Sequence, residues 1–350
     1  MDWKVQLVIL LGSLSCGFLL GRLMIPIFRR IKTGRFDFYI GDRFKKDGSE
    51  PRFGGGVMFL CLVMGAAMGT AAFTAADRTL SSWSDRSDMR LSVCAVFFCG
   101  ILTAVGFYED YQRDTKSGIG MKKIYRLSAE FVACVGFLLI LKALGYECRE
   151  VLLPFRMGYI DLGIGYEALT ALLMVLILNM VKFHDCSNGV TETGVDGLCP
   201  LSVMISALGI SSGLSYVGGH DSGQFFAVCT AGVCGGILFW CISPSKLYIG
   251  SSGSELLGGL MCVTMIFSRL HIAVLLSLAA PVIDSLCGLV QKTVFRRTKR
   301  LVFKGVSLHQ HLKNKGWGDY KIMLYFAVIQ FAGCGGAIAF MIYESKLHLG

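Results

Sequence analysis

Polar side chains interrupt a long apolar run near the middle of the chain. Asn179, Lys182 and Asp185 recur every three residues, which keeps them near one face of a helix that emerges from an apolar segment. Lysine supplies positive charge and aspartate a hard oxygen ligand, so the set suits a phosphate and its metal ion. The alternative is a capping turn with an exposed ion pair. The following loop adds Asn188 and Asp196 to the polar set.

A pair of adjacent carboxylates, Glu109 and Asp110, stands at the end of another apolar run. Such a pair can hold a divalent cation, or one member can act as a base while the other binds. The competing interpretation is a solvated helix end that pairs with Arg113 and Lys116. The pair alone does not decide between these two interpretations.

Three further segments carry residues suited to anions or to close contacts. Segment 243–254 is rich in Gly and Ser, so its backbone N–H groups could form an anion nest before the next helix, although plain turns share this composition. The glycines at 54–56 would let the backbone approach a neighbour closely. The third segment, residues 309–317, suits the binding of a nucleotide diphosphate, because its cations can pair with the phosphates and its aromatic ring can stack. Its imidazoles, cations and indole are His309, His311, Lys313, Lys315 and Trp317.

The elements that must position these residues are membrane helices. Of 350 residues, 54% are hydrophobic and only 17% charged, and the mean hydropathy is +0.60, far from soluble composition. We predict an all-α polytopic membrane protein with about ten transmembrane helices. The predicted spans begin near Val5, Gly55, Leu91, Leu127, Ala168, Leu201, Phe225, Leu256, His271 and Ile322. A small extracytoplasmic β-hairpin is predicted between the fourth and fifth helices, with strands at 150–155 and 159–162.

Charge predicts the orientation of these helices. The net charge of +10 is concentrated in segments 29–52, 109–126 and 292–321, which the positive-inside rule places in the cytoplasm. Both termini are then extracytoplasmic, and the first span is retained as a helix. Lipid headgroups explain the basic loops, so no nucleic acid is expected as a partner. The fourteen cysteines are interpreted as small buried residues, without a zinc pattern.

We expect residues 1–350 to form one domain whose active site comes from five cytoplasmic loops. These loops span 29–54, 109–126, 182–199, 244–254 and 293–320. The polar motifs described above all fall in them. A transporter is disfavoured, because transporters place polar residues near the middle of the membrane on broken helices.

Taken in order, the motifs resemble those of the phospho-N-acetylmuramoyl-pentapeptide transferase family, within the polyprenyl-phosphate N-acetylhexosamine-1-phosphate transferases. Segments 49–55, 106–111 and 120–130 are similar to the family's GTPTMGG, GFxDDY and GLSxxxKxxxQ motifs. The stretch from 179 is similar to NxxNxxDGxDGLA, 244–254 to PAxxFMGDTGS, and 309–321 to HHHFExxGWxExKV. Segment 281–284 also matches a stretch that this family carries before its last inner loop.

The resemblance implies a reaction and its partners. Phospho-N-acetylmuramoyl-pentapeptide would pass from its UDP-linked form to undecaprenyl phosphate in the cytoplasmic membrane of a bacterium, giving lipid I and UMP, with Mg²⁺ as cofactor and a homodimer as the assembly. The implied catalytic residues are Glu109, Asp110 and Asp185. The implied substrate-binding residues are Asn179, Lys182, Asn188, Lys123, Arg126, His309, His311 and Trp317. The implied metal positions are Asp185, Asp196 and Ser251.

The chain departs from the family's motifs at several of these positions. Glu109 replaces the first Asp of the pair, Lys182 replaces an Asn, and Ser251 stands where the family has a metal-binding Asp. Glu192, Asp196 or Glu255 could replace that ligand. Either Asn188, or Asp196 after an insertion, aligns with the second Asp of the DGxD motif, and Gln310 interrupts the three histidines. These departures leave two alternatives open, a related transferase for another UDP-N-acetylhexosamine and an impaired homologue that binds polyprenyl phosphate or a cell-wall precursor.

Overall fold

The computed structural model describes residues 1–30, 53–76, 86–113, 120–146, 150–153, 158–185, 195–218 and 221–348. Helices account for nearly all of them. The first six are α1 (Trp3–Arg30), α2 (Gly54–Ala76), α3 (Arg86–Gln112), α4 (Lys123–Ala143), α5 (Tyr166–Asp185) and α6 (Leu198–Val217). The remainder are α7 (Asp221–Cys241), α8 (Gly250–Ser268), α9 (His271–Ser277), α10 (Ala279–Thr298), α11 (Leu308–Asn314) and α12 (Asp319–His348), with a 3₁₀ turn, η2, at Gly163–Gly165.

The prediction of a polytopic helical membrane protein is confirmed. Eight of the described helices are long and apolar enough to cross a membrane, and α9 with α10 forms a ninth candidate span that bends by 76°. The predicted span near residue 256 is helix α8, which is not among these nine candidates and whose first turns are built from Gly, Ser and Glu255. Every residue of α8 is buried. Each of the ten residues near which a span was predicted to begin lies within a helix.

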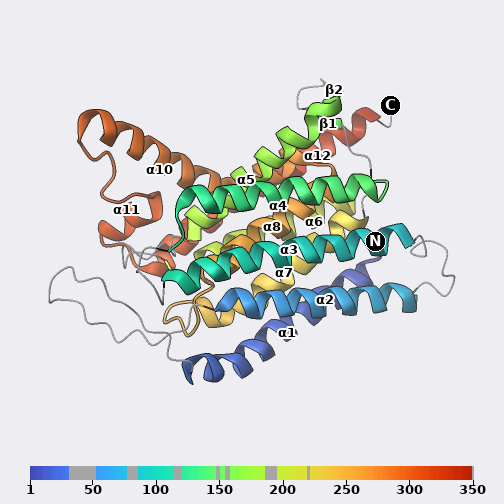
Figure 1. The fold of residues 1–350 in the computed structure, drawn as a ribbon, viewed down its shortest axis with the longest axis horizontal. Coiled ribbons are helices and arrows are strands. Elements are labelled where there is room, and N and C mark those ends of the chain that lie inside the picture. The colour runs from blue at the N-terminus through green and yellow to red at the C-terminus, as the bar shows by residue number, and fades with distance from the viewer. Residues whose placement is uncertain are drawn as a thin grey trace.

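Helix α8 lies at the centre of the bundle and packs against α2, α3, α5 and α7 (Figure 1). These neighbouring helices, and not lipid, surround α8. Polar residues of a helix can lie at membrane depth when protein surrounds them in this way. The predicted small buried cysteines contribute to this core. Among the described residues, nine cysteines are buried, three are half-buried and all are free thiols.

The predicted β-hairpin is present between α4 and α5. Strands β1 (Glu150–Leu153) and β2 (Gly158–Asp161) pair antiparallel, with Glu150 opposite Asp161. In Figure 1 the hairpin and both chain termini lie toward one end of the bundle, and α11 lies at the other.

Glycines bring two helices unusually close to the start of α8. A Cβ added at Gly106 in α3 would lie 2.5 Å from the Ser251 carbonyl oxygen, and one at Gly55 in α2 would lie 2.4 Å from the Gly253 nitrogen. Only glycine allows backbones to approach this closely. The close approach predicted for the glycines at 54–56 is therefore present at Gly54 and Gly55, whereas a Cβ at Gly56 would meet nothing within 4 Å.

Candidate functional site

The carboxylate of Asp110 caps the N-terminus of α8. Its Oδ1 and Oδ2 accept hydrogen bonds from the backbone N–H groups of Ser251 and Ser252, each at 3.0 Å. The first N–H groups of a helix have no partner within the helix, and Ile249 at the N-cap position provides no side-chain acceptor. Asp110 is 1% exposed. A residue of α3 thus completes α8, and the predicted anion nest at 243–254 holds this carboxylate.

Glu109, the neighbour of Asp110, faces a different partner. Lys182 Nζ lies 2.5 Å from Glu109 Oε2 and 2.8 Å from Glu255 Oε1. The lysine is 1% exposed, so the three side chains form a buried ion cluster that joins α3, α5 and α8. Buried charges are stable only when they are paired and hydrogen-bonded.

Two arginines and an amide extend this cluster toward α4. Arg113 Nη2 lies 3.2 Å and Arg126 Nη1 3.5 Å from Glu109 Oε1. Arg126 also donates to Asn179 Oδ1 at 2.9 Å and lies 3.0 Å from Glu130 Oε1, and Asn179 Nδ2 donates to Glu130 Oε2 at 2.7 Å. Three glutamates thus face three cations, which balances the cluster at full ionisation. We call Glu109, Glu130, Glu255, Lys182, Arg113, Arg126 and Asn179 the ion cluster.

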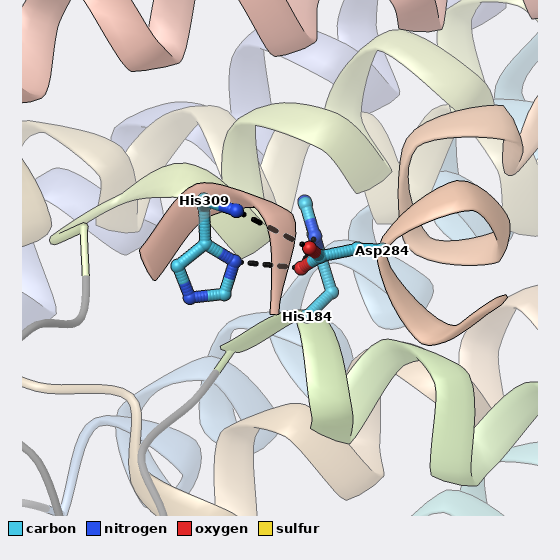
Figure 2. A group of neighbouring side chains, drawn as sticks. All are labelled: His184, Asp284 and His309. Atoms are coloured by element: carbon cyan, nitrogen blue, oxygen red, sulfur yellow. Dashed lines mark hydrogen bonds and ion pairs between the residues drawn. The ribbon is translucent and has the colours of Figure 1, made fainter. Parts of the chain in front are cut away.

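The opposite face of the last turn of α5 carries a second buried set. Residues two apart on a helix point about 200° apart, so His184 turns away from the ion cluster. Figure 2 shows His184, Asp284 and His309, which come from α5, α10 and α11. The Nδ1 atoms of both imidazoles lie within hydrogen-bond distance of Asp284 Oδ2, at 3.0 and 2.6 Å.

Hydrogen bonds also occupy the outer atoms of this set. His184 Nε2 lies 3.0 Å from Ser202 Oγ, and His309 Nε2 lies 3.2 Å from Ser307 Oγ. Asp284 Oδ1 accepts from the backbone N–H groups at 308 and 309, at 2.8 and 3.4 Å. The spacing would also admit a metal ion. Both rings are nevertheless directed at the carboxylate oxygen itself, which favours a hydrogen-bonded connection between α5, α10 and α11. We call His184, Asp284 and His309 the latch.

The remaining predicted substrate-binding residues lie around these two sets. Lys123 is exposed at the start of α4, and Trp317 is half-buried, with Lys321 Nζ 4.3 Å from the centre of its ring. His311 Nδ1 accepts from the Lys304 backbone N–H at 2.9 Å. Burial lowers the pKa of His311, with a further contribution from nearby lysines. Asn188 and Glu192 lie outside the described residues.

The predicted metal ligands do not converge on an Mg²⁺ site in the part of the chain that the structure describes. Mg²⁺ takes six oxygen ligands in near-ideal octahedral geometry, with carboxylates as its usual protein ligands. Ser251 offers a neutral hydroxyl, and Asp196 Oδ2 accepts a hydrogen bond from Ser245 at 2.9 Å. Both Asp110 oxygens are used by α8, and Lys182 stands between Glu109 and Glu255. Asp185 is the last residue of α5 and is half-buried.

Sequence reasoning missed several members of these sets. His184 and Ser202 gave no signal, because single polar residues on mostly apolar helices are common. Glu130 stood in a recognised motif without a role, and Arg113 was expected only as a solvated partner of the carboxylate pair. It does pair with Glu109, but in a buried site.

Comparison with known proteins identifies the family. The protein-family model described as Glycosyl transferase family 4 matches residues 92–269, just over half of the chain. The phospho-N-acetylmuramoyl-pentapeptide-transferase of Shouchella clausii (strain KSM-K16) is 26% identical over 333 residues, covering 94% of each chain. The enzyme of that name from Bacillus subtilis (strain 168) is 25% identical over 328 residues, 93% of this chain and 94% of the relative. The chain therefore belongs to glycosyl transferase family 4, and its similarity to enzymes named phospho-N-acetylmuramoyl-pentapeptide-transferase extends along nearly its whole length.

Proposed function

We propose that the protein transfers phospho-N-acetylmuramoyl-pentapeptide from UDP to undecaprenyl phosphate, giving lipid I and UMP in peptidoglycan synthesis. The observation that carries the proposal is that the relatives bearing this activity in their names align along nearly the whole chain. The ion cluster supports it, because five of its seven members come from three of the motifs on which the resemblance rests.

Transfer between two phosphates depends mainly on alignment and charge stabilisation, with little covalent chemistry for the protein. In the proposed reaction Glu109 takes the proton of the acceptor phosphate, Lys182 offers its remaining donor to a phosphate oxygen, and Arg126 exchanges carboxylate contacts for phosphate oxygens. Asp185 keeps its predicted catalytic role at the end of α5. Asp110 acts indirectly by fixing α8. We place this site on the cytoplasmic side, where the basic loops are predicted. Since the predicted Mg²⁺ ligands do not converge, no step is assigned to a metal.

The test is UMP release by the purified full-length protein in detergent, with UDP-N-acetylmuramoyl-pentapeptide and undecaprenyl phosphate. We expect UMP only when both substrates are present, and a large loss of rate in Glu109→Gln. Glu109 is replaced alone, because replacing Asp110 as well would also disturb α8. UMP release by Glu109→Gln at the wild-type rate would remove Glu109 from the mechanism.

One observation favours a second candidate, an impaired homologue that binds a polyprenyl phosphate or cell-wall precursor. All three cations of the ion cluster already face carboxylates, and Ser251 replaces an acidic residue of the family motif. In that case undecaprenyl phosphate would bind saturably without any UMP release. Binding to immobilised lipid, measured beside the UMP assay, separates the two candidates.

A further inference from the structure

The ion cluster holds a lysine where two acidic side chains meet. Glu109 belongs to α3 and Glu255 to α8, and they are 3% and 0% exposed. One oxygen from each lies within 2.8 Å of Lys182 Nζ. A divalent cation is commonly held by oxygens of this kind from neighbouring elements. The ammonium group therefore occupies the place between the carboxylates that such an ion would need.

Charge counting also argues against an added metal ion. Glu109, Glu130 and Glu255 are matched by Lys182, Arg113 and Arg126. A divalent cation placed among them would leave two uncompensated positive charges in a buried site, which is costly. With the five remaining groups ionised, removal of the lysine would instead leave one excess negative charge and two convergent carboxylates.

Among the described residues, the two motif positions next to the cluster, Asp110 and Ser251, offer it no anionic ligand. Both oxygens of Asp110 are directed at the first turn of α8, and the hydroxyl of Ser251 is neutral. The side chain of Ser251 is 0% exposed, and its Oγ has no hydrogen-bond partner among the described residues. The two changes from the family's motif, Lys182 and Ser251, thus act in the same direction, since one adds a fixed cation and the other removes an anionic ligand.

We infer that the Lys182 ammonium group takes the place of a divalent metal ion between Glu109 and Glu255, so that this site carries its own cation. Lysine is a compact point charge with three donors, so it can hold two carboxylates and still offer a donor to a phosphate. The inference deepens the proposed function and rests on it for its catalytic meaning. Its consequence for metal binding can be measured without any activity.

The test is Mn²⁺ binding to the full-length protein in detergent, followed by the loss of the free-ion signal in electron paramagnetic resonance. We expect no saturable Mn²⁺ binding at the cluster in the wild type. Lys182→Asn, which restores the amide of the family motif, should bind one Mn²⁺ saturably, at least about tenfold more tightly than any residual binding to the wild type. Lys142→Asn is the matched control, because Lys142 pairs with Glu167 at a more exposed position on α4.

Two results would overturn the inference. One is a wild-type protein that binds one Mn²⁺ and loses it in Glu255→Gln, because a metal would then share the cluster with the lysine. The other is a folded Lys182→Asn protein that binds no Mn²⁺. Should Lys182→Asn fail to fold, the wild-type and Glu255→Gln titrations still decide the question. A protein that lacks transferase activity yet shows the expected Mn²⁺ pattern would refute the proposed function and support the inference.

Discussion

Replacement of Asp110 by alanine should destabilise the protein strongly, because it removes the cap of the central helix. Two backbone N–H groups donate to its carboxylate at 3.0 Å, and the carboxylate is 1% exposed. Hydrogen bonds to charged groups contribute about 1.5–3 kcal/mol each. Alanine leaves both donors unpaired in a buried site, which predicts a loss of roughly 3–5 kcal/mol. Asp110→Asn keeps one acceptor oxygen and should lose about half as much.

Thermal unfolding in detergent measures this loss. A thiol-reactive fluorophore reports unfolding directly, since nine of the described cysteines are buried and all are free. Asp221→Ala is the matched control, because Asp221 also begins a helix but is exposed and pairs with the N-terminal ammonium. Exposed pairs contribute at most about 1 kcal/mol. If Asp110→Ala and Asp221→Ala lower the unfolding midpoint equally, Asp110 does not stabilise the N-terminus of α8.

Three further changes test the packing and the latch. Gly106→Ala places a Cβ 2.5 Å from a backbone oxygen of α8 and should cost about 1–3 kcal/mol, whereas Gly136→Ala meets nothing within 4 Å and should not lower the unfolding midpoint. Asp284→Ala leaves two buried imidazoles without their shared partner and should lower the free energy of unfolding by about 2–4 kcal/mol. Proteolysis around α11 should be faster than in the wild type, and unchanged proteolysis would contradict the latch. His311 has a lowered pKa, so its neutral form contributes stability above its unfolded pKa of about 6.5 that is lost as the pH falls through the folded pKa. His311→Gln should flatten the decline of the unfolding midpoint as the pH falls below about 6.5, and an unaltered pH profile would exclude this residue as its source.

Hydropathy predicted the helices well because lipid contact selects for apolar residues over whole spans. Helix α8 shows the limit of that signal. It is buried on all sides by protein, so its first turns can carry Gly, Ser and Glu255 and still lie in the bundle. The bend between α9 and α10 was not predicted either, since the break falls within a continuous apolar stretch.

The sequence predicted which residues belong to the site but not how their side chains are arranged. Glu109 and Asp110 are adjacent and chemically alike, but side chains one residue apart on a helix point about 100° apart. One therefore meets Lys182 and the other α8, which only the packing of three helices decides. The same geometry separates Lys182 from His184. The expected contribution of His309 to substrate binding stays a prediction, although the structure gives this side chain a buried partner in Asp284.

The most direct test of the account is the formation of lipid-linked product in the presence of excess EDTA. Purified wild-type protein would be incubated with UDP-N-acetylmuramoyl-pentapeptide and undecaprenyl phosphate, and the lipid fraction examined by mass spectrometry. We predict lipid I from the wild type at similar rates with EDTA and with Mg²⁺, and little from Glu109→Gln. Product that appears only with Mg²⁺ would contradict the role given to Lys182, and its absence under both conditions would contradict the proposed transferase.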